Sequence, residues 1–162
     1  MHRFRSALRQ AVFILVLSAA VAFTVNALRP GGLPVLQAKE SVVQVSDANG
    51  TIALKDALVL SMSGRALFLD ARSDWEYGNG HIQNALPFSP DEFDYALELY
   101  RPRLDKAQNL IAYCDGALCE LSTKLADKLR SAGYANVYVL ENGWTLWNNE
   151  GLPTEQGPAP TE

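Results

Sequence analysis

From residue 54 to residue 149, short apolar runs of strand length alternate with segments whose apolar residues recur at helical spacing. The strand-like runs are residues 66–70, 109–113 and 137–140, and the helical segments are residues 54–62, 91–100, 120–132 and 144–149. Continuous apolar strands are typical of a parallel sheet that helices cover on both faces. The alternation therefore predicts an α/β sandwich around a mostly parallel central sheet.

The N-terminus has a different character. Residues 11–28 (AVFILVLSAAVAFTVNAL) carry no formal charge and follow Arg3, Arg5 and Arg9. As a helix this run would be about 27 Å long, close to the hydrocarbon thickness of a bilayer. By the positive-inside rule, a single-pass helix here leaves the N-terminus in the cytoplasm and the rest of the chain on the extracytoplasmic (periplasmic) side of the membrane.

A cleaved signal peptide is the competing interpretation, because Val25, Asn26 and Ala27 resemble a small-x-small cleavage site. The apolar run is longer than the usual core of a signal peptide, which favours a retained anchor. Both interpretations export the domain.

The predicted organisation has five parts. They are a basic cytoplasmic N-terminus at residues 1–10, a transmembrane anchor at 11–28, a linker at 29–40, one globular domain at 41–153 and a disordered tail at 154–162. Within the domain, residues 41–45 predict an edge strand and residues 82–88 predict a further extended piece.

The charge distribution excludes some functions. Four of the 14 basic residues lie in the first 29 positions, which contain no Asp or Glu, so the remaining chain has 10 basic and 18 acidic residues. A domain this acidic does not suit a phosphate backbone, and nucleic acid is not an expected partner. Two Cys and two distant His do not form a metal site, and no metal or organic cofactor is predicted.

One thiol lies where parallel sheets place their chemistry. Cys114 follows the predicted strand at residues 109–113, and a short loop containing Gly116 separates it from the helix that begins at residue 120. Unpaired N–H groups and the positive end of the helix dipole would stabilise a thiolate or a persulfide anion there. By position alone, Cys114 fits a nucleophile and a small buried core residue equally well.

Three motifs occur in order along the domain. They are Asp70-Ala71-Arg72 with Glu76-Tyr77 and Gly80-His81-Ile82-Gln83-Asn84-Ala85; then Tyr113-Cys114; then Val139-Leu140-Glu141-Asn142-Gly143-Trp144 with Trp147 and Gly151-Leu152-Pro153. Together they resemble the rhodanese family of sulfurtransferase-like domains over residues 51–154. The resemblance implies a rhodanese-like three-layer sandwich with a mostly parallel central sheet, preceded here by one N-terminal transmembrane helix.

The resemblance also implies residue roles. Cys114 would be the catalytic nucleophile that accepts a sulfane sulfur. The segment whose backbone would bind the resulting persulfide is Asp115, Gly116, Ala117, Leu118 and Cys119. Asp70 and Arg72 would form a supporting buried pair behind the site, and His81 is interpreted as a structural imidazole.

The turns and the loop depart from the family pattern. Asn84 and Asn142 replace glycines, and Asn is the residue other than Gly that best tolerates left-handed φ. The common loop form is Cys-x-x-Gly-x-Arg-[Ser/Thr]. Here Gly116 comes one residue early, no Arg is present, and the loop is a residue or two longer.

The charge of the loop indicates which class of sulfur donor the site would accept. Asp115 and Glu120 place two carboxylates around the thiol, which disfavours a dianion such as thiosulfate and favours a polysulfide or a low-molecular-weight persulfide. Glu120 also stands where the related phosphatases need an Arg, so phosphatase activity is excluded.

Cys119 is open to three interpretations. It closes a disulfide with Cys114 in an oxidising compartment, or it is the resolving thiol that converts a Cys114 persulfide into a disulfide with release of sulfide. The third interpretation, slightly favoured for Cys119 taken alone, is a small apolar residue packed under the loop.

The leading functional hypothesis is a membrane-tethered, exported sulfurtransferase or sulfane-sulfur carrier, with a small sulfur donor and a thiol acceptor as partners. One alternative is a catalytically weak rhodanese-like module that binds a protein partner at the membrane. Another is a thiol–disulfide redox element made of Cys114 and Cys119.

Overall fold

A computed structural model describes residues 2–28, 50–116 and 118–158; in the first helix, the side chains of residues 2–8, 23 and 26–28 lie outside the described part. The chain divides into two compact units, residues 1–42 and 43–162. The predicted linker at 29–40 and the predicted edge strand at 41–45 lie outside the described residues.

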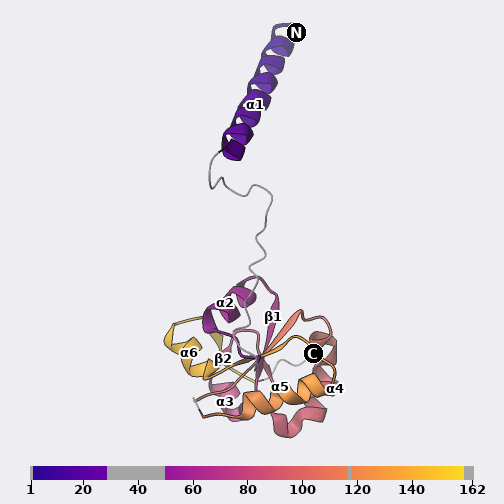
Figure 1. Ribbon diagram of the computed structural model, residues 1–162, viewed down its shortest axis with the longest axis vertical. Helices are drawn as coiled ribbons and strands as arrows, with labels where there is room; N and C mark the ends of the chain where they lie inside the picture. The colour runs from indigo at the N-terminus through magenta and orange to yellow at the C-terminus, as the bar shows by residue number, and fades with distance from the viewer. Residues whose placement is uncertain (1, 29–49, 117, 159–162) are drawn as a thin grey trace. The chain divides into compact units, whose positions relative to one another are not determined.

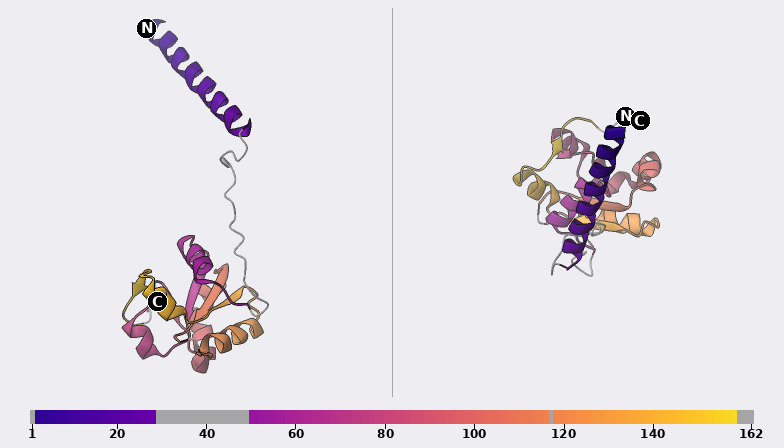
Figure 2. Two further views of the ribbon diagram at one scale, coloured as in Figure 1. Left: turned by 60° about the vertical axis from the view of Figure 1, so that its left-hand side comes forward. Right: turned by 90° about the horizontal axis from the view of Figure 1, so that it is seen from above.

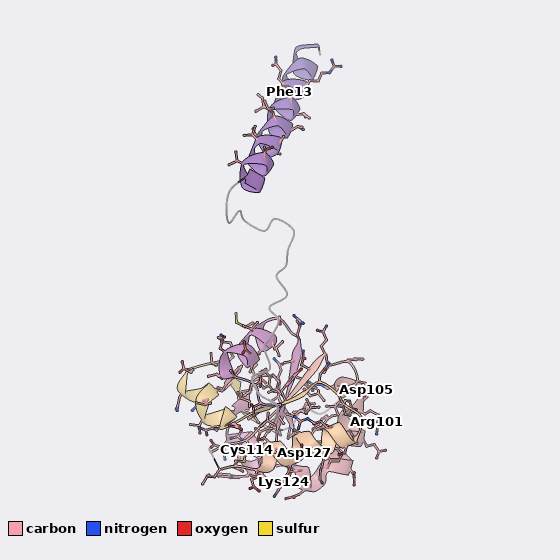
Figure 3. The ribbon with its side chains drawn as sticks, viewed as in Figure 1. Phe13, Arg101, Asp105, Cys114, Lys124 and Asp127 are labelled. Carbon is pink, nitrogen blue, oxygen red and sulfur yellow. A yellow bond between two sulfur atoms is a disulfide. The ribbon has the colours of Figure 1, made fainter. Side chains whose placement is uncertain are left out.

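The first unit contains helix α1 (His2–Leu28), which includes the whole predicted apolar run. The apolar side chains described along it project outward, with Phe13 68% and Leu15 70% exposed (Figure 3). Among the described residues, no helix meets the length and apolarity needed to cross a membrane. The membrane anchor stays a prediction.

The second unit is built on a four-stranded parallel sheet with the order β3-β1-β4-β5 (Figure 1). Its strands are β1 (Ala66–Asp70), β3 (Leu86–Pro87), β4 (Asn109–Tyr113) and β5 (Val137–Leu140). The predicted bounds of β1, β4 and β5 are confirmed, because a continuous apolar run suits a strand buried on both faces. The register pairs Asp70 with Tyr113 and Tyr113 with Leu140, so these three strands end at one level.

Helices cover both faces of this sheet (Figures 1 and 2). One face carries α4 (Phe93–Leu104) and α5 (Leu121–Ser131), and the other carries α2 (Leu54–Met62), α3 (Asp74–Asn79) and α6 (Gly143–Asn149). Successive side chains of β1 alternate between the faces, so that Phe68 packs in one buried cluster and Leu69 in the other. The α/β sandwich predicted from the sequence is therefore the observed architecture, with three layers.

The extended piece predicted over residues 82–88 is wrong as a single element. It consists of two short strands, β2 (His81–Ile82) and β3, separated by a turn in which Asn84 adopts a φ of 61°. β2 pairs antiparallel with β6 (Thr154–Glu155) in a separate two-stranded sheet. The tail predicted as disordered is therefore ordered at its beginning, while residues 159–162 lie outside the described part.

Two helices also differ from the predictions. The segment predicted at residues 91–100 starts with a 3-10 turn, η1 (Pro90–Glu92), and continues as α4 to Leu104. Helix α3 is not among the predicted elements. Ser73 begins it with a capping box, in which its hydroxyl accepts the N–H of Glu76 and its own N–H donates to the Glu76 carboxylate.

Candidate functional site

The carboxyl ends of the central strands gather the residues that the sequence assigns to the site. Asp70 ends β1, Tyr113 ends β4, and Cys114 follows Tyr113 directly. Because the two strands are parallel and end at one level, these residues lie at the same edge of the sheet. This is the edge at which open α/β sheets carry their chemistry.

Cys114 lies between the end of β4 and the first turn of α5 and has no exposed surface. Figure 3 shows it near α5, the helix that carries Lys124 and Asp127. Its sulfur is 3.3 Å from the Oγ of Ser122, a residue of α5 that is only 1% exposed. Cys114 is thereby tied to the beginning of the helix that follows it.

A disulfide joins Cys114 to Cys119, with a distance of 6.4 Å between their Cα atoms. A disulfide sulfur carries no proton, so the hydroxyl of Ser122 is the donor toward Cys114. Cys119 also packs against the buried cluster on the α5 face, but packing alone does not describe it. The structure shows the oxidised state of the cysteine pair.

Hydrogen bonds hold Gly116 and Cys119, two of the described residues in the loop that the disulfide closes. The N–H of Gly116 donates to the carboxylate of Asp115 and to the side-chain oxygen of Asn142, both at 2.9 Å. The N–H of Cys119 donates to the carbonyl of Gly116 at 3.2 Å. In the oxidised state these two N–H groups are engaged away from the sulfur of Cys114. The predicted persulfide-binding arrangement stays an expectation for the reduced protein.

The carboxylate of Asp115 has a structural role that its sequence position does not reveal. Besides the N–H of Gly116, it accepts a hydrogen bond from the hydroxyl of Thr145 in α6. The bond from Thr145 ties the loop to α6. Of the other predicted loop residues, Leu118 is 95% exposed, and Ala117 lies outside the described residues.

A buried polar network joins the ends of β1 and β4. Two nitrogens of Arg72 donate hydrogen bonds to the carboxylate of Asp70. Nε donates to Oδ1 at 2.9 Å, and Nη2 donates to Oδ2 at 2.6 Å. The hydroxyl of Tyr113 donates to Oδ2 of Asp70 at 2.7 Å and accepts the N–H of Ile82 at 3.1 Å. Nη2 of Arg72 also donates to the carbonyl of Gly80 at 2.7 Å. Asp70 and Arg72 therefore form the buried ion pair that the sequence predicts, and Tyr113 belongs to the same network; their supporting role at the site stays a prediction.

The protonation states of this network follow from burial and proximity. Burial opposes the charge of Arg72, but the hydrogen bonds and attraction of Asp70 outweigh it and raise the pKa of Arg72. Burial, and then the negative charge of Asp70, raise the pKa of Tyr113 well above its ordinary value, so its hydroxyl stays a donor. The guanidinium of Arg72 lies 4.6 Å from the ring centre of Trp144, whose backbone N–H donates to the carbonyl of Cys114. The network is thereby linked to the backbone of Cys114.

Comparison with known proteins assigns the family. Residues 53–150 match the family model of the Rhodanese-like domain. The chain belongs to the rhodanese-like family. A tRNA uridine(34) hydroxylase from Erwinia tasmaniensis is 33% identical to it over 101 residues, which are 60% of this chain and 28% of that protein. This chain therefore spans less than a third of that relative.

Solved structures share the fold. A protein from Bacillus halodurans superposes with a TM-score of 0.59 at 24% identity, covering 67% of this chain and 77% of its own. The thiosulfate sulfurtransferase from Pseudomonas aeruginosa superposes with a TM-score of 0.54 at 23% identity, covering 64% of this chain and 19% of its own. At these identities the likeness shows a common fold.

In this rhodanese-like domain, Ser122 is a site residue that the sequence argument misses. The family's common loop pattern ends in Ser or Thr, and the longer loop here puts Ser122 two positions later than the pattern requires. The Ser or Thr at the end of the family's loop pattern is the sequence feature that could have identified Ser122. Asn142 and Thr145, which hold the loop from the segment after β5, leave no such signal because they lie far from it in the sequence.

The remaining sequence candidate is His81, which contacts Tyr77. Nδ1 of His81 is 2.8 Å from the carbonyl oxygen of Tyr77, and the two rings stack with their centres 3.7 Å apart. His81 is thus a structural imidazole, as predicted. Within the described part of this rhodanese-like chain, no group of three or more His, Cys, Asp and Glu is arranged to hold a metal ion.

We expect substitutions of two residues in the buried network to lower the stability of the domain by different amounts. We expect Arg72→Met to lower the free energy of unfolding by about 3–5 kcal/mol, because it leaves the buried carboxylate of Asp70 without its counter-charge. Tyr113→Phe removes one neutral donor and one acceptor, and we expect a loss of about 1–3 kcal/mol. Urea unfolding followed by circular dichroism measures both. A smaller loss for Arg72→Met than for Tyr113→Phe contradicts this account.

Proposed function

We propose that this rhodanese-like domain is a sulfurtransferase or sulfane-sulfur carrier whose reacting atom is the Sγ of Cys114. The observation that carries the proposal is the position of Cys114 between the end of a central parallel strand and the first turn of α5. A thiolate and a persulfide are both anions, and a helix N-terminus together with the hydroxyl of Ser122 stabilises an anion at that position. Membership in the rhodanese-like family supports the same chemistry.

The reaction begins from the reduced pair, because a sulfur held in a disulfide is not a nucleophile. The thiolate of Cys114 attacks the outer sulfur of a donor RSSH, the bond between the two donor sulfurs breaks, and RS⁻ leaves and takes a proton from solvent. The product is a persulfide on Cys114. An acceptor thiolate then attacks its outer sulfur, carries that sulfur away, and regenerates the thiolate of Cys114.

The charges around Cys114 favour a thiol-borne donor. The loop of residues 114–120 contains no Lys or Arg, and it carries the carboxylates of Asp115 and Glu120. Arg72, a cation at the same sheet edge, is buried and engaged by Asp70. A dianion such as thiosulfate therefore meets uncompensated negative charge, whereas a polysulfide or a low-molecular-weight persulfide carries less charge into the site.

The proposal predicts that Cys114 alone takes up sulfur. Reduced Cys114→Ser, treated with glutathione persulfide without oxygen, should gain no sulfur atom by intact-mass spectrometry, because a hydroxyl of ordinary pKa does not supply the nucleophile. Reduced Cys119→Ser is the matched control and should gain one sulfur atom. Uptake by Cys114→Ser together with none by Cys119→Ser would show that the nucleophile is Cys119.

We further propose that residues 11–28 tether the domain to a membrane, with the domain on the extracytoplasmic side. The support is the charge-free apolar run behind Arg3, Arg5 and Arg9, and the outward apolar side chains along α1, such as those of Phe13 and Leu15. Apolar side chains on all sides of an isolated helix are stable in lipid and costly in water.

The topology predicts opposite activities for two reporters fused after Glu162 in a bacterial host. Alkaline phosphatase should be active and β-galactosidase inactive, because the first requires export and the second requires the cytoplasm. Leu17→Arg is the control: a charge at the centre of the run costs about 2.5–3.5 kcal/mol on insertion, so it should reduce phosphatase activity. An active β-galactosidase fusion with an inactive phosphatase fusion would refute export.

A further inference from the structure

The disulfide of the structure points to a second half-reaction. We propose that Cys119 is the resolving thiol: it attacks the persulfide on Cys114, releases sulfide, and leaves the Cys114–Cys119 disulfide. The domain is then a sulfane-sulfur reductase that converts a persulfide into a thiol and sulfide. This inference rests on the proposed formation of a persulfide on Cys114.

The path of the loop brings the two sulfurs together. Gly116 has a φ of 83°, which turns the chain back, and a side chain at this position would meet no atom within 4 Å. The turn closes when the N–H of Cys119 donates to the carbonyl of Gly116. Asn142 holds the same turn through the N–H of Gly116. A loop held in this way keeps Cys119 at a high effective concentration beside Cys114.

The position of each thiol decides which sulfur of the persulfide it attacks. In the oxidised structure Cys114 has no exposed surface, and its sulfur becomes the inner sulfur of the persulfide. Cys119 is bonded to that sulfur in the structure, so it reaches it from within the loop. An external acceptor that attacks the outer sulfur gives transfer, whereas Cys119 attacks the inner sulfur, which gives sulfide.

The step balances in atoms and electrons. The thiolate of Cys119 attacks Sγ of Cys114, the bond from that Sγ to the outer sulfur breaks, and the outer sulfur leaves as hydrosulfide. Over both half-reactions, RSSH and the dithiol protein give RSH, H₂S and the disulfide protein. The sulfane sulfur gains two electrons and the cysteine pair loses two.

Before the domain can react again, the Cys114–Cys119 disulfide must be reduced. A dithiol reductant suits this step, because one such molecule completes the exchange without leaving a mixed disulfide on the protein. Its point of attack is Cys119, which keeps part of its surface exposed while Cys114 keeps none. Cys114 then leaves as the thiolate, to which Ser122 already donates at 3.3 Å. Reduction in this direction therefore frees the sulfur of Cys114, which is the proposed nucleophile.

Single-turnover stoichiometry tests the inference on the full-length protein. Reduced wild-type protein receives one equivalent of glutathione persulfide without oxygen, and released sulfide, free thiols and intact mass are measured. We expect about one sulfide per chain, the loss of both thiols, and a mass lower by two hydrogens. Cys119→Ser should release at least about tenfold less sulfide and should keep one added sulfur atom. The donor alone and the protein alone are the blanks.

The other outcomes separate the two proposals. A wild-type protein that keeps the added sulfur and its Cys119 thiol overturns the resolving role and leaves the sulfur carrier standing. Equal release of sulfide by wild type and Cys119→Ser also overturns it, because sulfide then leaves by another route. No uptake and no sulfide from either protein overturns the proposed function itself. Cys119→Ala repeats the test with a variant that carries no hydroxyl.

Discussion

The carboxylate of Asp70 connects three segments at the sheet edge where the proposed chemistry takes place. It is fully buried, and it is held by the guanidinium of Arg72 and by the hydroxyl of Tyr113. Tyr113 is the residue before Cys114, so the bond to Asp70 fixes the point at which the loop leaves β4. The same hydroxyl accepts the N–H of Ile82 and so holds β2 in place. The position of Cys114 depends on this network.

Above that fixed base, the loop has one covalent restraint and several weak ones. The covalent restraint is the Cys114–Cys119 disulfide, and the weak ones are the hydrogen bonds that Gly116 and Asp115 make to Asn142 and Thr145. In the proposed cycle, reduction removes the covalent restraint and resolution restores it. In that cycle the same loop would bind the persulfide and carry the thiol that attacks it, and the carboxylates of the loop would favour donors of low charge.

Much of this arrangement could be predicted from the sequence, for a physical reason. β1, β4 and β5 are continuous apolar runs, so their bounds follow from burial on both faces, and Asn84 and Asn142 take the positive φ expected where they replace Gly. β6 could not be predicted, because two residues in a Pro- and Gly-rich tail become a strand only by pairing with β2. The state of Cys119 could not be predicted either. The spacing from Cys114 permits packing and pairing alike, and the path of the loop past Gly116 decides between them.

The most direct test of this account compares the two oxidation states of one protein. The full-length protein is prepared with the Cys114–Cys119 pair fully oxidised or fully reduced, freed of reagents, and given glutathione persulfide without oxygen. The initial rate of donor loss is measured. The account predicts that the reduced protein reacts at least about tenfold faster, because only the free thiolate of Cys114 attacks the donor. Cys119→Ser should keep the fast rate after the same oxidising treatment. Equal rates for oxidised and reduced wild-type protein would contradict the central role of the pair.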